Sequence, residues 1–439
     1  MASSKWLFAI LLCLANSCFA EIRTLTIRQA LELIARQSPD VLLARLDEQR
    51  AREQIMVAED PFRPKMNVGS DAVYTSGYPN SINEEAPRIL GARINMDLYN
   101  RPKRYELAET REQARATHSA LEAKVDDVTY QVISLFLDAQ ELIGRTQRIQ
   151  NQLVSATAIA NKTDARVTAG YELPVERTRA RISTLDIQQR LDSTRADQGD
   201  AEHRLAIILG FPPADSVRPA GTPEQLNLPP LGSESEAINH AFGRNKELAQ
   251  LQSALLAKQI EMASFKAARL PHADLVAQYS LLRKSDYEAY FPANSIQRNN
   301  GQIGASLVLP LLLGPARGGH LGQSQADFLK LRIQIDRLQN HIVSSVHRSY
   351  QELQKAGSAL DLARQQLDLA SSDFEVRSAQ YAEGRALLSQ VEKARLSENE
   401  YSVAVWGDQI NIKRAQLGVL RQLGGLASAL LQANSSLGQ

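Results

Sequence analysis

The sequence predicts a mainly helical protein with a transmembrane β part, built from a duplicated unit of helix, strand, strand, very long helix and helix. Three observations predict this class: long apolar seams at heptad spacing, four short segments in which polar and apolar residues alternate, and a repeated order of these elements along 439 residues. Only 5% of the residues are aromatic, whereas Ala, Leu, Gln, Glu and Arg abound. This bias is typical of long helices and coiled coils.

The first 20 residues have the pattern of a cleaved export signal. Lys5 precedes the apolar run Trp6–Ala15, and the small residue Ala20 stands at the expected cut. The run is shorter than the ~20 residues that a membrane-spanning helix needs. We therefore expect residues 1–20 to be removed and Glu21 to begin the mature chain.

The composition excludes several classes of protein. Both cysteines, Cys13 and Cys18, lie inside the expected signal, so the mature chain has no thiol for a disulfide or a metal site. The formal net charge is +1, which disfavours a nucleic-acid partner because such proteins carry a basic excess. No apolar run of 18 residues follows Ala20, so no transmembrane helix is expected.

Two stretches of the chain carry sustained heptad seams. Small and apolar residues recur at alternating steps of four and three from Leu121 to Val167, and no proline interrupts Lys103–Leu173. A second seam runs from Leu331 to Phe374. Such seams impose a left-handed supercoil, and a helix of this length measures about 100 Å.

Four segments alternate between polar and apolar residues, which is the periodicity of a β-strand. We expect strands at about 65–76, 88–98, 273–282 and 302–310. Each approaches the ~9–11 residues that a tilted membrane strand needs. A half-buried sheet in a soluble protein shows the same alternation, but the export signal and the absence of cysteines favour a membrane barrel.

Four strands are too few to close a barrel, since the smallest well-filled barrels use about eight. Open strand edges are not tolerated in lipid, so strands from several chains must join. Three copies would supply twelve strands and a water-filled lumen, whereas two copies would leave a narrow or filled one. Oligomerisation is therefore a requirement of this interpretation.

The two halves of the chain share one plan. Gly170, Leu173, Glu176, Ala180 and Arg181 match a second set with identical internal spacing: Gly384, Leu387, Gln390, Ala394 and Arg395. We therefore predict a signal peptide at residues 1–20, a first structural repeat at 21–225 and a second at 226–439. The two repeats are expected to form one elongated domain, with the proline-rich segment Phe211–Pro230 as the linker between them.

These residues resemble the TolC family of outer-membrane efflux and secretion channels, over nearly all of the mature chain. The markers are Val308-Leu309-Pro310 followed by Gly318-Gly319, the segment Ile208–Pro212 at the end of the first copy, and the two glycine turns. The resemblance implies a homotrimer in the lipid of the Gram-negative outer membrane. It implies a 12-stranded β-barrel that continues into a periplasmic α-helical coiled-coil barrel.

The resemblance also implies a function and partners. The chain would be the outer-membrane subunit of a tripartite efflux or type I secretion system, a passive conduit to the cell exterior. Its partners would be a periplasmic adaptor (membrane fusion protein) and an inner-membrane pump or ABC transporter. A non-channel periplasmic coiled-coil adaptor or structural protein is the alternative, and it would not need lipid-facing strands.

In this family the two helix–turn–helix hairpins form the closed periplasmic end of the pore. By resemblance, the turns fall at Val167–Val175, with Gly170, and at Tyr381–Leu388, with Gly384. Glu176 matches an acidic latch position and Tyr381 a tyrosine latch.

The chain departs from the family pattern at the second turn. Arg385 stands one place before the expected arginine position, which is Ala386, and the acidic positions that narrow the pore fall on Gln390 and Lys393. We hypothesise that Glu176 pairs with Arg385 or a nearby base across the end of the pore.

No other chemistry is indicated by the sequence. The histidines form no pair with metal-ligand spacing, and the glycine-rich segment Gly314–Gly322 lacks the Lys-Ser/Thr of a phosphate-binding loop. Asp126 and Asp127 are interpreted as a solvated pair on a long helix, not as an acid–base dyad. We expect no cofactor, no metal and no catalytic residues, and therefore no enzyme.

Overall fold

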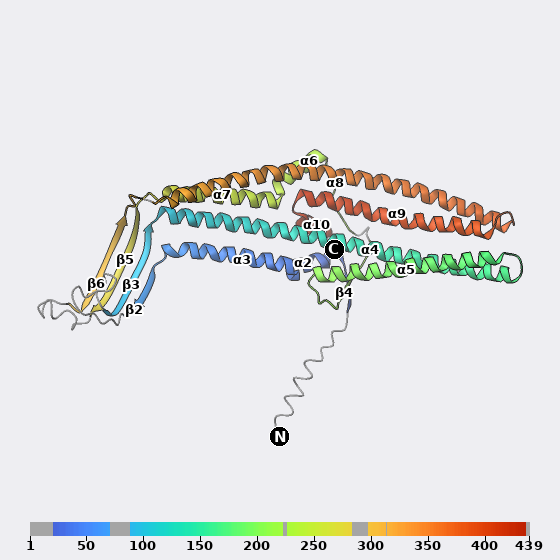
Figure 1. The fold of residues 1–439 in the computed structure, drawn as a ribbon, viewed down its shortest axis with the longest axis horizontal. Coiled ribbons are helices and arrows are strands. Elements are labelled where there is room, and N and C mark those ends of the chain that lie inside the picture. The colour runs from blue at the N-terminus through green and yellow to red at the C-terminus, as the bar shows by residue number, and fades with distance from the viewer. Residues whose placement is uncertain (1–20, 71–87, 223–225, 283–296, 313, 436–439) are drawn as a thin grey trace, which may run out of the picture. The chain divides into compact units, whose positions relative to one another are not determined.

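The computed structural model describes residues 21–70, 88–222, 226–282, 297–312 and 314–435 (Figure 1). The expected signal peptide lies outside these residues. Two compact units divide the described chain: one holds the residues up to Arg45, Ala120–Glu247 and those from Leu338 on, and the other holds Leu46–Ser119 and Leu248–Arg337.

Helices make up most of both units. They are α2 (Ile27–Gln37), α3 (Pro39–Glu59), the short 3-10 turn η1 (Asp60–Phe62), α4 (Arg101–Thr168), α5 (Pro174–Ile208), α6 (Glu234–Arg244), α7 (Lys246–Ala267), α8 (Ala316–Ala382), α9 (Leu388–Leu423) and α10 (Leu426–Ser435). The expected very long helices are confirmed as α4 and α8, of 68 and 67 residues. In the described part of the chain, no helix combines the length and the apolar character needed to cross a membrane.

The heptad seams are the buried faces of these helices. Every predicted seam residue of α4, from Leu121 to Val167, is buried or half-buried, and so is every predicted seam residue of α8 from Leu331 to Phe374. By contrast Val154, one residue off the α4 seam, is 63% exposed. The seam therefore directs the packing of each long helix against its neighbours.

Four strands form one antiparallel sheet in the second unit. They are β2 (Lys65–Gly69), β3 (Arg88–Tyr99), β5 (His272–Leu282) and β6 (Asn299–Val308), in the order β2-β3-β5-β6 (Figure 1). The two strands of each sequence half are thus neighbours, and the two halves meet at the β3–β5 pair. The part of the first predicted strand after residue 70 lies outside the described residues, and β6 ends two residues before the predicted boundary.

The register of the sheet sorts polar and apolar residues onto opposite faces. One cross-strand row is apolar: Met66, Ile94, Ala277 and Ile303. The adjacent row is polar: Asn67, Arg93, Gln278 and Gln302. Neighbouring rows point to opposite faces because side chains alternate along a strand. The predicted two-faced sheet is therefore confirmed.

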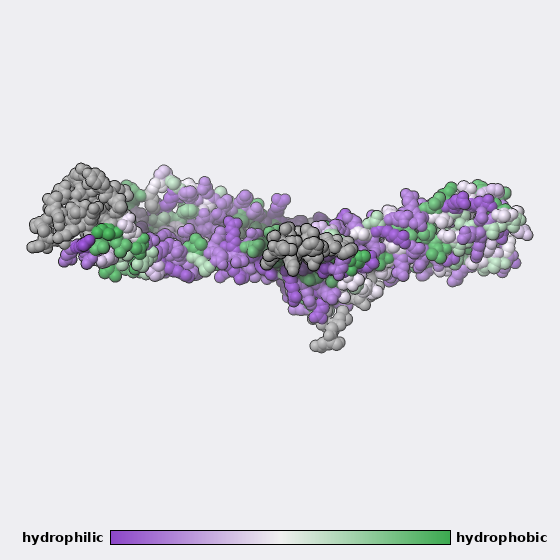
Figure 2. Space-filling view, turned by 90° about the horizontal axis from the view of Figure 1, so that it is seen from below, coloured by the Kyte–Doolittle hydropathy of each residue, from purple (hydrophilic) through white to green (hydrophobic). Residues whose placement is uncertain are grey.

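The apolar face of the sheet is exposed in the single chain. Ile303 is 80% exposed, Leu307 is 73% exposed and Met66 is 63% exposed. Figure 2 shows hydrophobic residues gathered on the surface formed by the strands. Within the described residues, the outer edges of β2 and β6 are also unpaired. An exposed apolar surface on such a sheet indicates a face that is covered by lipid or by another chain.

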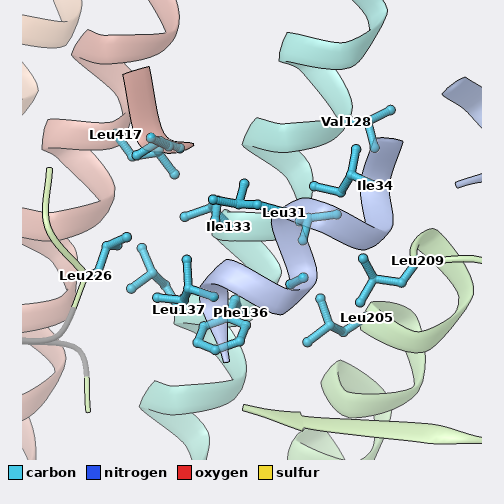
Figure 3. Close-up of a cluster of buried hydrophobic side chains, with 14 of the residues drawn as sticks. Leu31, Ile34, Val128, Ile133, Phe136, Leu137, Leu205, Leu209, Leu226 and Leu417 are labelled. Atoms are coloured by element: carbon cyan, nitrogen blue, oxygen red, sulfur yellow. The ribbon is translucent and has the colours of Figure 1, made fainter. Parts of the chain in front are cut away.

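The main hydrophobic core lies in the first unit, where segments far apart in the sequence meet around Phe136 (Figure 3). Leu31 and Ile34 of α2, Ile133 of α4 and Leu417 of α9 are all at most 5% exposed. Two short strands, β1 (Ile22–Leu25) and β4 (Ser216–Pro219), border this core and pair in parallel.

The segment Phe211–Pro230 is more than the linker that the sequence predicts. It contains β4, and its residues Val217 and Leu226 are fully buried in the main core. Pro212 and Pro213 lie at a turn before β4, as expected, but the strand itself is too short for the apolar pattern to reveal.

The first helix of each repeat is broken in two, which the sequence interpretation did not foresee. Helix α2 is followed by Ser38, which precedes Pro39, and α6 is followed by Asn245; both of these residues have an extended backbone. The residue before a proline is biased away from the helical region, which explains the first break. Both helices begin with a capping box, formed by Thr26 with Gln29 and by Ser233 with Glu236.

The interpretation of Asp126 and Asp127 as a solvated pair was wrong. The Asp126 carboxylate accepts hydrogen bonds from the backbone N–H groups of Gly425 (2.8 Å) and Ala427 (3.0 Å), at the start of α10. Asp127 pairs with the Arg421 guanidinium at 2.9 Å. A carboxylate at a helix N-terminus accepts hydrogen bonds from the free N–H groups of the helix and interacts favourably with the helix dipole. Asp126 therefore fixes α10 to α4.

Replacing Asp126 by alanine is expected to loosen α10 by about 1–2 kcal/mol, because two backbone donors lose a charged acceptor. Hydrogen exchange of the Leu426–Ser435 amides should become about tenfold faster or more. Asp127→Ala is the control, since its ion pair is partly exposed and such pairs contribute about 0–1 kcal/mol. Equal acceleration in both variants would contradict a specific capping role for Asp126.

Candidate functional site

The ends of the two long hairpins have the same local structure. In the first turn, between α4 and α5, the Gly170 N–H donates to the carbonyl of Val167 (3.1 Å) and the Tyr171 N–H donates to that of Arg166 (2.9 Å). In the second turn, between α8 and α9, Gly384 and Arg385 donate to Tyr381 (3.0 Å) and Gln380 (2.8 Å) in the same way. This pattern ends a helix and requires a residue with positive φ.

Glycine meets this requirement in both turns. Gly170 has φ +77° and Gly384 has φ +75°, a region that other residues adopt at a cost of about 1–2 kcal/mol. Each following helix begins four residues after its glycine, directly after Leu173 and Leu387. The identical spacing of the two glycine sets therefore reflects two copies of one turn.

Ion pairs brace the first turn. Arg166 of α4 contacts Glu172 inside the turn at 2.9 Å, and Arg177 of α5 contacts Asp164 of α4 at 2.5 Å. The Arg177 guanidinium also donates to the Thr168 hydroxyl at 3.1 Å. These contacts hold the two helix ends together at the turn.

The predicted latch residues lie at the two turns but take local partners. Glu176 binds Arg179 at 2.6 Å, on the same helix, and Arg385 binds Glu383 at 3.1 Å. Glu176 and Arg385 therefore do not pair within one chain. The side chain of Glu176 is 26% exposed, whereas that of Arg385 is 77% exposed, so Arg385 is open to a partner from another chain.

The other predicted residues of the pore end also lie at the second turn. Tyr381 is half-buried in the last turn of α8, and Lys393 is exposed on α9. The Gln390 side chain accepts a hydrogen bond from the Leu387 N–H at 3.4 Å, and thus helps to cap the N-terminus of α9.

Sequence reasoning missed an acidic residue in a cleft between the hairpins. The cleft is small and is lined by α4 (Gln152, Ser155), α5 (Ser183) and α9 (Glu392, Arg395) among others. Arg395 crosses it and donates to the Ser155 hydroxyl at 3.0 Å. The buried Oε1 of Glu392 has no hydrogen-bond partner within the described chain.

The environment of Glu392 changes its ionisation. Burial, followed by the negative charges of Glu172 and Glu176, raises the pKa of Glu392 to about 7. A signal for this site was present in the sequence: Glu392 stands four residues after Leu388 and four before Leu396, and both of these pack inward. Helical spacing therefore places Glu392 on the buried face of α9.

The stability of this region should decrease as the pH rises from about 4.5 to about 7. A carboxyl whose pKa is raised on folding stabilises the fold while it is protonated, and this contribution is lost as the pH passes through the raised pKa of about 7. Hydrogen exchange of the amides at the start of α9, corrected for its intrinsic pH dependence, measures this effect. Over this pH range, the free energy of opening should fall by up to about 2 kcal/mol.

Glu392→Gln should remove this pH dependence and raise protection at pH values above about 7, because the neutral amide avoids the buried charge. Glu398→Gln is the control, since Glu398 on the same helix accepts a hydrogen bond from Ser371 at 3.2 Å. A pH profile that is unchanged in Glu392→Gln would show that another group titrates there.

Apolar side chains are exposed at both hairpin ends. Tyr171 is 77% exposed, Leu173 and Leu387 are each 67% exposed, and Val175 is 53% exposed. Figure 2 shows hydrophobic residues interspersed among polar ones at this end of the helices. Together with the ion pairs, this surface is suited to contact other protein chains. Among the described residues there is no cluster of three or more His, Asp or Glu side chains suited to hold a metal.

The fold is similar to that of solved outer-membrane proteins. The outer membrane protein VceC of Vibrio cholerae has a similar fold, with a TM-score of 0.73 at 14% identity, over 91% of this chain and 96% of that one. The CmeC outer membrane channel of Campylobacter jejuni has a TM-score of 0.75 at 13% identity, over 91% of this chain and 85% of that one.

Sequence comparison agrees with this class. Residues 30–211 match the family described as outer membrane efflux protein. Over 99% of its length, this chain is 24% identical to the outer membrane protein TolC of Salmonella enteritidis, of which the match covers 89%. The outer membrane efflux protein BepC of Brucella suis is 20% identical over 70% of this chain and 65% of that protein. In sequence and in fold, the chain is thus similar to outer membrane efflux proteins.

Proposed function

We propose that three copies of this chain form the outer-membrane channel of a tripartite export system. Each copy contributes its four-stranded sheet to a 12-stranded barrel, and its long helices to a periplasmic coiled-coil barrel. The channel is a passive conduit, and an inner-membrane pump or ABC transporter supplies the energy through a periplasmic adaptor. TolC and BepC are described as outer membrane proteins. The outer membrane is also the location of this chain.

The two-faced sheet with open edges is the observation that carries the proposal. Its apolar row from Met66 to Ile303 has no cover within the described chain, and the outer edges of β2 and β6 have no partner strand there. In lipid, unpaired backbone groups are costly and closed barrels avoid them. Pairing β6 of one copy with β2 of the next closes the barrel and turns the polar rows toward the lumen.

The test is to isolate the mature protein from outer membranes. We expect a trimer that survives heating in mild detergent and that forms ion-conducting pores in planar bilayers. A cysteine pair placed on β2 and β6 should cross-link only between copies. A protein recovered as a soluble periplasmic monomer without conductance would instead support the alternative of a coiled-coil adaptor or structural protein.

The two hairpin turns are proposed to form the periplasmic entrance, with Gly170, Glu176, Tyr381, Gly384, Arg385, Gln390 and Lys393 at or near the constriction. In the trimer the exposed Arg385 of one copy would face an acidic group of its neighbour, with Glu176 as the candidate. The exposed residues Leu173 and Leu387 would contact neighbouring copies or the adaptor. These contacts between copies close the entrance, and substitutions that reverse the charge of a contacting residue would break them.

Glu176→Lys is expected to raise the single-channel conductance of the trimer, because a lysine repels Arg385 and Arg179 and opens the entrance. Planar-bilayer recordings measure this directly. Asp186→Lys is the control, since Asp186 lies on the same helix beyond the turn and pairs with Arg190 at 3.2 Å. Unchanged conductance in Glu176→Lys would remove Glu176 from the closing contacts.

A further inference from the structure

Both backbone groups of Glu21, the N–H and the carbonyl, are hydrogen-bonded to residues around the start of β4. Its N–H donates to the Asp215 carboxylate, with 3.3 Å between N and Oδ1, and its carbonyl accepts from the Ser216 N–H at 3.1 Å. The following residues continue as β1, with Ile22 paired to Ser216. Glu21 is therefore anchored directly before the first residue of this parallel pair.

Asp215 is placed to bind a cation. Its side chain is only 7% exposed, and its Oδ2 lies 3.4 Å from the Arg23 guanidinium. Arg23 is shared, since it also binds the Glu21 carboxylate at 2.7 Å and lies over the ring of Phe211, 5.0 Å from its centroid. The Oδ1 atom of Asp215 faces the Glu21 nitrogen, so a positive charge at that nitrogen would complete the site.

We propose that a leader peptidase cleaves the chain after Ala20, and that the new α-ammonium group of Glu21 forms an ion pair with the buried Asp215 carboxylate. Water adds across the Ala20–Glu21 peptide bond: Ala20 leaves with a carboxylate, and the Glu21 amine takes up a proton. The nitrogen thereby changes from a neutral amide with one N–H to a cation with three donors.

Processing therefore strengthens the contact that starts β1. A hydrogen bond from a charged donor to a carboxylate is about twice as strong as one from a neutral donor. Because the Glu21 carbonyl is already fixed by Ser216, the cation needs little rearrangement to meet Asp215. The parallel β1–β4 pair, and with it the edge of the main core, is held more firmly in the mature chain than in the precursor.

The reactivity of the α-amine tests the ion pair. Protein extracted from outer membranes is treated with an amine-acylating reagent near neutral pH, and the modification of Glu21 is followed over time by mass spectrometry. The mass of the untreated protein should place the first residue at Glu21. In Asp215→Asn the α-amine should react about fivefold faster than in the wild type, which corresponds to about 1 kcal/mol of lost pairing.

Glu202→Gln is the matched control. Glu202 is a buried carboxylate that binds Arg218 of β4 at 2.8 Å, so its loss loosens the same strand without removing the partner of Glu21. The labelling rate in this variant should equal that of the wild type. Equal acceleration in both variants would overturn the ion pair, because strand loosening would then explain the effect.

A second variant moves the charge without touching Asp215. One alanine inserted between Ala20 and Glu21 shifts the α-amine by one residue, about 3.8 Å along the chain. Its labelling rate should rise to that of Asp215→Asn. A mature chain that begins at another residue, or an inserted variant that reacts as slowly as the wild type, would overturn the proposal.

Discussion

Replacing Ile303 by arginine is expected to abolish assembly of the channel. Ile303 is 80% exposed and lies in the apolar row of the sheet, so in the proposed barrel it faces the lipid. An arginine on the lipid face costs about 2–4 kcal/mol at the bilayer midplane, and the trimer would bear this penalty once in every copy. Outer membranes from cells with this variant should lack the heat-resistant oligomer, and bilayers should show no conductance.

Gln302→Arg is the matched control for this change. Gln302 precedes Ile303 on β6 and lies in the polar row, across from Gln278, so the arginine would point into the water-filled lumen. This variant should assemble and alter only conductance or ion selectivity. Normal assembly of Ile303→Arg would contradict a lipid-facing apolar row, and failure of both variants would indicate that β6 tolerates no bulky residue.

The sequence was most informative where structure depends on local periodicity. The heptad steps from Leu121 to Val167 identified the buried face of α4, because residues three and four apart share one side of a helix. Alternation around Ile94 and Ile303 likewise identified the two faces of the sheet. Matched spacing predicted two equal turns at Gly170 and Gly384, and their hydrogen bonds confirm this.

Other features depend on contacts between segments distant in the sequence, and periodicity does not reveal those. Strands β1 and β4 are four residues each and almost 200 positions apart, too short to show alternation. Asp126 was interpreted without its partner because the amides it caps lie about 300 positions later. The inward direction of Glu392 was readable from spacing, but the charges of Glu172 and Glu176 beside it were not.

Three Gly→Ala substitutions should change stability in graded and opposite ways. Gly210 follows α5 with φ +82°, and a Cβ there would overlap the carbonyl oxygen of Gln37 at the end of α2. Gly424 after α9 repeats this arrangement, because a Cβ would come within 2.6 Å of the Arg244 oxygen at the end of α6. The glycine thus permits a close approach of two helix ends in each repeat.

Gly210→Ala is expected to lower the free energy of unfolding by about 2–4 kcal/mol, because backbone strain and steric overlap add. Gly170→Ala has the same strain but open space around the Cβ, so about 1–2 kcal/mol should be lost. Gly199→Ala, in the interior of α5 with ordinary φ and open space, should gain about 0.5–1 kcal/mol from helix propensity. Urea denaturation of the detergent-solubilised protein measures the unfolding free energy of all three variants.

A loss for Gly210→Ala no larger than that for Gly170→Ala would mean that α2 shifts easily at Gln37 to make room for the methyl group. The close approach would then be incidental to the core, because only a rigid contact makes the added methyl group more costly than the backbone strain alone.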